Sequence, residues 1–200
     1  MTRWKTGVAI VALGIVASAP CLYPRLETGR LWHDVIGVDV SGHQGEIEWP
    51  SLAAGGIGFA YIKATEGGDF RDKQFQRNWD GARAAGVLPP ALDAEHMGPC
   101  PRGQTVDVRG EMLAFMNLIE AHYGKRPVVY VTREFDQAYL DGHFETESFW
   151  VRNLFWPPAI RKHRWLFWQF HHRGQRRGIG GPVDLDAFRG SASDLAAMAR

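Results

Sequence analysis

The sequence is poor in cysteine and lacks the residue spacings that hold metal ions. Only two cysteines, Cys21 and Cys100, occur in 200 residues, and no Cys-x-x-Cys pair is present. The eight histidines show no ligand spacing, so we interpret them, His171 and His172 included, as surface or loop residues. The sequence therefore excludes a disulfide-dense scaffold and predicts no metal site. A Cys21–Cys100 disulfide remains open and requires export of the chain.

An excess of charge of either sign is also missing. The chain has 23 basic and 22 acidic residues, which gives a formal net charge of +1 and argues against a nucleic-acid-binding surface. It contains no internal repeat or low-complexity segment, and 45% hydrophobic residues exclude a disordered chain. This length predicts one domain. Aromatic residues are plentiful, with 8 tryptophans that suit core packing or stacking on sugar rings.

Residues 1–30 have a different pattern from the rest. Arg3 and Lys5 precede an uncharged run from Thr6 to Cys21, which ends near the small residues Ala17-Ser18-Ala19. Three interpretations stay open: a cleaved export signal, an uncleaved anchor approaching the roughly 20 residues of a membrane span, and a buried core helix. Export is favoured. It predicts a folded domain over 31–200 in a secreted or periplasmic protein, with the inner membrane contacted only through an anchor.

Alternating apolar segments predict strands and helices in turn. Strands are expected at 35–40, 58–64, 91–94, 127–132, 149–151, 165–170 and 183–185, and helices at 50–54, 72–86, 105–124 and from 193 onward. Alternation in the first two thirds predicts a parallel sheet with helical crossovers. The last third has strands in succession and no good helix. The expected fold class is therefore α/β, an irregular TIM-like β/α barrel with a strand-rich second half.

Acidic residues gather where these strands end, which is where barrel enzymes place their chemistry. The residues at the strand ends are Asp39, Lys63, Glu66, Asp93, Glu95, Asp184 and Asp186. Asp93 and Glu95 share one face of a strand, with Cα atoms about 6.6 Å apart. Carboxylates that close repel, so one of them tends to hold a proton, and such a pair can split a glycosidic bond. The alternative is that each acid caps a loop or pairs with a nearby Lys or Arg.

Other signals are weaker. Gly178-x-Gly180-Gly181 lacks the strand-then-helix context of a nucleotide site and is interpreted as a loop. Arg173, Arg176 and Arg177 predict a solvated basic turn. Core packing and sugar binding both remain open for the tryptophans Trp150, Trp156, Trp165 and Trp168.

Taken together, several strings resemble glycoside hydrolase family 25, the Ch-type lysozymes. They cover nearly all of 35–190: Gly37-Val38-Asp39-Val40-Ser41, Gln44-Gly45-x-Ile47-x-Trp49, Phe59–Gly67, Asp72-x-x-Phe75-x-x-Asn78, Pro90-Ala91-Leu92-Asp93-Ala94-Glu95, Pro127–Tyr130, Phe149-Trp150-Val151, Trp168-Gln169-Phe170 and Gly181–Asp186-x-Phe188.

The resemblance implies an enzyme that cleaves the β-1,4 bond after N-acetylmuramic acid in peptidoglycan, without metal or cofactor. Glu95 matches the general acid and Asp93 its carboxylate partner. Asp39 and Asp184 match the flanking acids of the same site, and the matched Lys63 and Trp168 are expected to bind substrate. The chain is expected to be a monomer whose partner is the peptidoglycan polysaccharide and not a nucleic acid.

One departure from the family pattern is large. The family normally has a strand resembling Gly-Ala-Tyr-His-Phe and a helix before the Asp-x-Glu strand. Here Gly86-Val87-Leu88 runs directly into Pro89-Pro90, so about one strand and one helix, on the order of 30 residues, are missing. The barrel then either closes by pairing strands that are normally one apart or stays open with an exposed edge.

Three functions follow from these observations. The first is an active muramidase that retains the family's acids. The second is a non-catalytic peptidoglycan-binding remnant, inactivated by the missing strand. The third is a different carbohydrate enzyme, such as a chitinase-like barrel, which the absence of the longer acidic string of that group disfavours.

Overall fold

A computed structural model describes residues 26–66, 69–83, 91–94, 107–161 and 164–198. Its strands are β1 (Val35–Val40), β2 (Ile57–Ile62), β3 (Thr65–Glu66), β4 (Phe70–Arg71), β5 (Ala91–Ala94), β6 (Val128–Thr132), β7 (Phe149–Arg152), β8 (Trp165–Gly174) and β9 (Val183–Phe188). The seven strands expected from the sequence are all present. The two-residue strands β3 and β4 were not expected, and they pair with each other as a separate antiparallel hairpin.

The helical segments are α2 (Trp49–Ala54), α3 (Phe75–Ala82), α4 (Val108–Tyr123), α5 (Arg133–Phe135) and α6 (Ala192–Met198), with the 3-10 turns η2 (Thr28–Leu31) and η3 (Gly42–Gln44) and the π-helical turn η5 (Asp136–Leu140). The short segments α5 and η5 follow β6 directly and were not expected from the sequence. Thr132, the last residue of β6, caps the start of α5, because its Oγ1 accepts a hydrogen bond from the Phe135 amide at 3.3 Å.

Helix α4 is bounded as its sequence predicts. The Asp107 side chain caps its first turn by accepting from the Gly110 amide at 3.0 Å, and Gly124 ends it with a left-handed φ of 69°. The buried face of this helix is narrow. Met112 and Met116 are buried, whereas Phe115 and Tyr123 are exposed.

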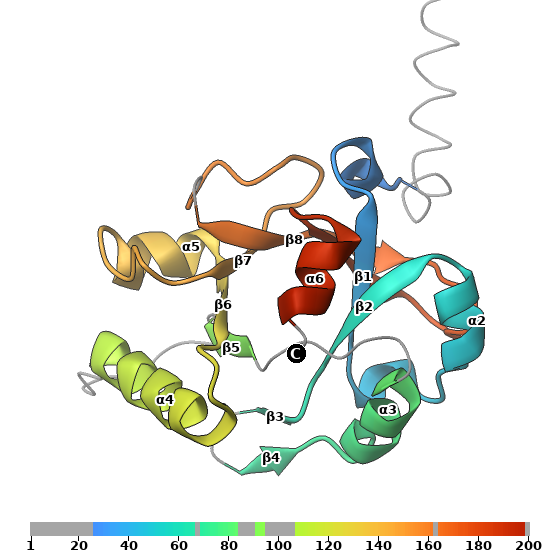
Figure 1. Ribbon diagram of the computed structural model, residues 1–200, viewed down its shortest axis with the longest axis horizontal. Coiled ribbons are helices and arrows are strands. Elements are labelled where there is room, and N and C mark those ends of the chain that lie inside the picture. The colour runs from blue at the N-terminus through green and yellow to red at the C-terminus, as the bar shows by residue number, and fades with distance from the viewer. Residues whose placement is uncertain (1–25, 67–68, 84–90, 95–106, 162–163, 199–200) are drawn as a thin grey trace, which may run out of the picture.

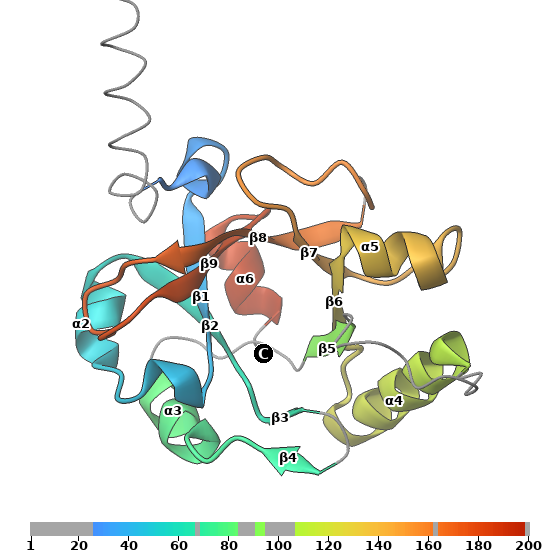
Figure 2. The ribbon, with the colours of Figure 1, turned by 180° about the vertical axis from the view of Figure 1, so that it is seen from behind.

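The seven long strands form one sheet in the order β2-β1-β9-β8-β7-β6-β5. Strand β9 lies antiparallel between β1 and β8, and the neighbouring pairs that do not include β9 are parallel. The sheet curves into a ring, and α6 overlies the centre of that ring, in front of the strands in Figure 1 and behind them in Figure 2. In the described part of the chain, β2 and β5 are the two ends of the sheet and do not pair. The α/β fold is confirmed, and of the two expectations for the barrel, the described strands follow the open one.

The sheet separates two apolar clusters. On the inward face, Phe59, Tyr130, Trp150, Phe167 and Phe188 pack together with Leu195 of α6. On the outward face, alternate residues of the same strands pack against α2, α4 and the segment after β6. The period-two alternation of each strand thus decides which side chains enter the ring. Among the described residues, no helix combines the length and the apolar character needed to cross a bilayer.

Two expectations for the segment around β8 are wrong. His171 is a buried residue of this ten-residue strand, not a surface histidine. Arg176 is not a solvated turn residue, because its side chain is 8% exposed and pairs with Glu27 at 3.0 Å. Residues 175–182 around the Gly178-x-Gly180-Gly181 run do form a loop, as predicted.

Candidate active site

The inward face of the sheet changes from apolar to polar along every long strand whose side chains are described. Strand β1 passes from Val35 to Asp39, and β2 passes from Phe59 through Tyr61 to Lys63. Strand β9 runs in the opposite direction and carries its acids at its start. Since β1, β2, β6, β7 and β8 point the same way, their polar ends meet at one rim of the ring.

Asp39 and Asp184 lie directly opposite each other in the antiparallel β1–β9 ladder. Both occupy inward positions, because Val38 and Leu185 beside them belong to the outward cluster. Side chains paired in this way have Cβ atoms about 4.5–5.5 Å apart. The structure therefore brings these two predicted site residues together.

Asp186 lies one inward position further along β9 and is fully buried. The Trp150 indole donates its Nε1 hydrogen to Asp186 Oδ1 at 2.7 Å. Burial, together with the nearby charges of Asp39 and Asp184, raises the pKa of Asp186 well above its ordinary 3.8, although the Trp150 bond opposes this. The strand-end acids thus include one whose environment favours the protonated form.

Gln169 connects two sides of this rim. Its Oε1 accepts a hydrogen bond from the Tyr130 hydroxyl at 2.9 Å, and its Nε2 donates to Asp184 Oδ2 at 3.2 Å. Both contacts fix the Asp184 carboxylate relative to β6 and β8. The amide therefore acts as a rigid link, since both of its ends are used.

Lys63 follows β2 and donates to Glu66 Oε2 at 2.7 Å. Partial burial alone lowers the pKa of Lys63, but the hydrogen bond and charge of Glu66 and the charges of Asp93 and Asp39 together raise it. Asp39 lies on β1 and Asp93 on β5, the far end of the sheet. Lys63 thus lies within electrostatic range of acids from both sides of the β2/β5 opening.

Asp93 is an exposed residue of β5, paired in register with Tyr130 of β6. It therefore lies on the same inward row as Tyr130 and Trp150. Glu95, the expected general acid, lies outside the described residues, as does Cys100. The geometry thus covers Asp39, Asp93, Asp184 and Lys63 of the predicted site.

The prediction that Trp168 binds substrate is contradicted by its position. Its side chain is fully buried in the outward cluster, and its indole Nε1 donates to the Asn153 carbonyl at 2.5 Å. Trp168 alternates with the inward-facing Gln169, so the strand places it on the wrong face for the rim. Among the tryptophans left open, Trp150 and Trp165 are buried, whereas Trp156 is 67% exposed.

Several residues that build the rim were not predicted as site residues. Trp150 stacks on Tyr61 with ring centroids 4.2 Å apart, and it meets Tyr130 edge-on at 4.6 Å. With Gln169 and Asp186 they form the support beneath the acids. Their shared inward parity with Asp39 and Asp184 is a signal that the sequence already contains.

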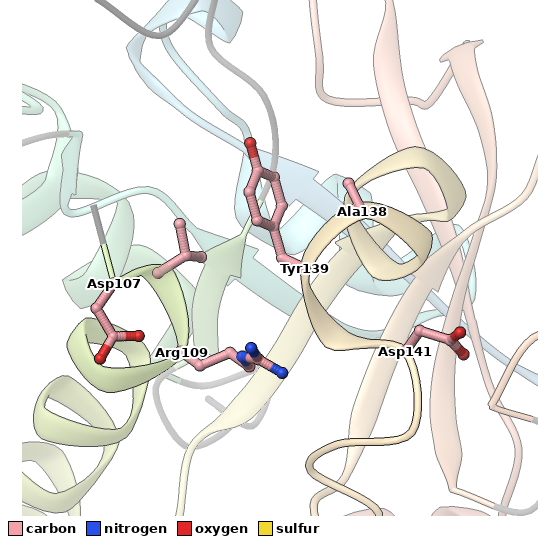
Figure 3. A pocket seen from close by; sticks show the side chains of 6 residues that line it. Asp107, Arg109, Ala138, Tyr139 and Asp141 are labelled. Carbon is pink, nitrogen blue, oxygen red and sulfur yellow. The ribbon is translucent and has the colours of Figure 1, made fainter. Parts of the chain in front are cut away.

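A separate cavity of about 220 Å³ lies between the start of α4 and η5 (Figure 3). It is lined by Asp107, Val108, Arg109, Ala138, Tyr139 and Asp141, none of which was predicted as a site residue. Among the described residues, no group of three or more His, Cys, Asp or Glu side chains could hold a metal ion. The chemistry available at the rim is that of carboxyl groups in different environments, which suits acid-assisted cleavage of a glycosidic bond.

A family model described as glycosyl hydrolases family 25 matches residues 38–89 and 86–179. The chain belongs to glycosyl hydrolase family 25. Similar relatives of this family 25 chain include the uncharacterized protein YegX of Escherichia coli K12, 32% identical over 200 aligned residues that cover 83% of this chain and 74% of YegX. Lysozyme M1 of Streptomyces globisporus is 29% identical, with 82% of this chain and 71% of that protein covered.

Solved structures agree with the family 25 fold. A family 25 glycosyl hydrolase from Bacillus anthracis superposes with a TM-score of 0.76 at 27% identity, over 84% of this chain and 94% of that one. The bacterial lysozyme from Streptomyces coelicolor gives a TM-score of 0.73 at 29% identity, over 82% and 96%.

The comparisons also agree with a shortened family 25 chain. The two stretches of the family match meet at 86–89, where the missing strand and helix were expected. The alignment with YegX spans 200 positions but uses only 83% of this 200-residue chain, so part of YegX within the alignment has no counterpart here.

Proposed function

We propose that this chain is a lysozyme-like glycoside hydrolase that cleaves the β-1,4 bond between N-acetylmuramic acid and N-acetylglucosamine in peptidoglycan. The observation that carries the proposal is the gathering of Asp39, Asp184 and Lys63 at one rim of a family 25 sheet, with Asp93 on the same inward row. Relatives that bear the name lysozyme support the same substrate.

Each acid then has a role that its position suits. Glu95, two residues beyond Asp93, protonates the leaving oxygen of the glycosidic bond. Asp93 stabilises the positive charge that develops at the sugar ring or orients the substrate's acetamido group. Asp39 and Asp184 flank the ring from β1 and β9. Lys63 contacts the substrate and limits the repulsion among these carboxylates.

Purified peptidoglycan provides the direct test. The wild-type chain is expected to release new reducing ends that carry muramic acid, whereas Glu95→Gln is expected to lose at least about 100-fold in rate, because an amide cannot donate the acidic proton. Glu120→Gln is the matched control, since Glu120 is an exposed residue of the last turn of α4, which leads into the start of β6 and not into its rim end.

The other two functions predict different outcomes. Folded wild-type protein that binds peptidoglycan without cleaving it would establish the binding remnant and refute the proposal. Reducing ends without muramic acid would indicate a chitinase-like specificity instead.

We further propose that residues 1–30 direct export, as a cleaved signal or as an inner-membrane anchor. The basic start and the uncharged run at 6–21 support export. Export would bring the chain to the compartment that contains peptidoglycan. Cell fractionation with N-terminal sequencing of the mature protein distinguishes a cleaved signal, an anchor and a cytoplasmic chain. Size-exclusion chromatography tests the expected monomer.

A further inference from the structure

Asp186 differs from the other strand-end acids in being sealed beneath the rim. Its side chain is fully buried, whereas Asp93 is exposed. Because a substrate cannot reach a fully buried carboxyl group, Asp186 does not take part directly in bond cleavage. Its effect must pass through the residues that it contacts.

The contacts of Asp186 are uneven. Oδ1 accepts the Trp150 Nε1 hydrogen at 2.7 Å, but Oδ2 is buried and has no hydrogen-bond partner among the described residues. The Tyr61 hydroxyl, on the ring that stacks against Trp150, is likewise buried without a partner in the described part of the chain. An ionised carboxylate requires several donors when it is buried, and here the described residues provide one.

The charges on the inward face favour the same conclusion. Asp39 lies diagonally across the β1–β9 ladder from Asp186, and Asp184 is its neighbour on β9. Within the described part of the chain, the titratable and charged groups on this face around Asp186 are Asp39, Tyr61, Lys63, Asp93, Tyr130, Arg152 and Asp184. Asp39 and Asp184 both raise the pKa of Asp186, in addition to the larger effect of burial.

We propose that Asp186 is a positioning residue that stays protonated in the working enzyme and holds the Trp150 indole beneath the catalytic rim. The neutral carboxyl group accepts from Trp150 through Oδ1 and keeps its proton on Oδ2. Trp150 in turn fixes Tyr61 by stacking and Tyr130 by edge contact. Tyr130 donates to Gln169, which donates to Asp184, so the chain of contacts ends at an acid of the rim.

This inference rests on the proposed function for its kinetic test but not for its spectroscopic test. At neutral pH, infrared spectroscopy of the full chain is expected to show the carbonyl band of a protonated carboxyl group that is absent in Asp186→Asn. Asp141→Asn, which changes an exposed aspartate outside the rim, should keep the band. If no such band distinguishes wild type from Asp186→Asn, the proposal is wrong, whether or not the chain hydrolyses peptidoglycan.

Kinetics test the positioning role. Asp186→Asn keeps a neutral group with an acceptor oxygen, so kcat/KM should stay within about threefold and the acidic limb of its pH profile should coincide with that of wild type. Asp186→Ala removes the acceptor for Trp150 and should lower kcat/KM at least about tenfold without moving that limb.

An ionised Asp186 predicts the opposite result for the asparagine variant. Removing a negative charge beside Asp39 and Asp184 would make both easier to ionise and would move the acidic limb to lower pH. Such a shift would overturn the proposal, and so would an alanine variant that folds and retains full activity. If the alanine variant does not fold, the asparagine profile and the infrared band still decide.

Discussion

The two sides of the candidate catalytic rim are built very differently. Asp39 and Asp184 lie in the middle of the sheet, on strands that pair with neighbours on both sides. Asp93 lies on β5, a strand at the end of the sheet, and its side chain is exposed. One side of the rim is therefore fixed by continuous ladders and a buried network, whereas the other lies at an open edge.

This difference between the two sides shows how a shortened family 25 chain could retain the acids of the candidate site. The sequence predicts that a strand and a helix of the family pattern are absent between α3 and β5, and the residues that hold Asp184 and Asp186 come from β6, β7 and β8. Such a deletion would therefore leave the laddered side of the rim intact. Its expected cost falls on the edge strands β2 and β5, whose outer backbone groups lack a neighbouring strand in the described sheet.

Removing the centre of the inward cluster should have the largest effect. Phe167 is fully buried and lies 4.9 Å from the ring of Phe188 and 5.3 Å from those of Phe59 and Tyr61. Phe167→Ala should lower the free energy of unfolding by about 3–5 kcal/mol in denaturant titrations. Phe115→Ala on the exposed face of α4 is the control, with an expected change below about 1 kcal/mol. A loss below 1 kcal/mol for Phe167→Ala would show that this cluster does not stabilise the laddered side.

The pH dependence of stability tests the buried acid within that side. Since the pKa of Asp186 is raised in the folded state, the unfolded chain releases its proton first, and stability should fall as pH rises above about 4. Asp186→Asn removes this loss, so the variant should gain stability relative to wild type by about 1.4 kcal/mol per pH unit until the folded pKa is reached.

Thermal or urea unfolding between pH 4.5 and 7 measures the difference in slope. The slope of unfolding free energy against pH is the decisive quantity. Any effect of the amide that does not depend on pH changes the stability equally at pH 4.5 and at pH 7, so it leaves the slope unchanged. Parallel curves for wild type and Asp186→Asn would mean that Asp186 binds no more protons in the folded chain than in the unfolded one.

Much of the fold could be predicted because its signals are local. Buried Val and Ile runs define β1 and β6, and Asp107 and Gly124 define α4. The hairpin β3–β4 and the short α5 and η5 contain too few residues for a periodic pattern. The burial of Arg176 depends on Glu27, 149 residues away in the sequence.

The candidate site likewise has features that the sequence predicts and features that depend on the tertiary structure. Strand-end position predicted that Asp39 and Asp184 gather at one rim, and the β1–β9 ladder pairs them directly, although the antiparallel direction of β9 was not predicted. The period-two alternation, applied to β8, would have assigned Gln169 to the inward face and Trp168 to the outward face. The sealing of Asp186 by Trp150 could not be predicted, since it requires the order in which distant strands pair.

The smallest expected effect concerns Lys63, which lies where the two sides of the rim meet. Its ammonium group is within electrostatic range of Asp39 on the laddered side and Asp93 on the open side. Lys63→Met keeps the length of the side chain but removes the charge, so nearby carboxyl groups become harder to ionise. The acidic limb of kcat/KM should move to higher pH, and kcat/KM at the optimum should fall about tenfold.

Glu66→Gln is the control, because it removes the partner of Lys63 at 2.7 Å and leaves the ammonium charge in place. If Lys63→Met keeps the acidic limb of the wild type, the charge of Lys63 does not influence the ionisation of the acids on either side, and the laddered and open sides titrate independently.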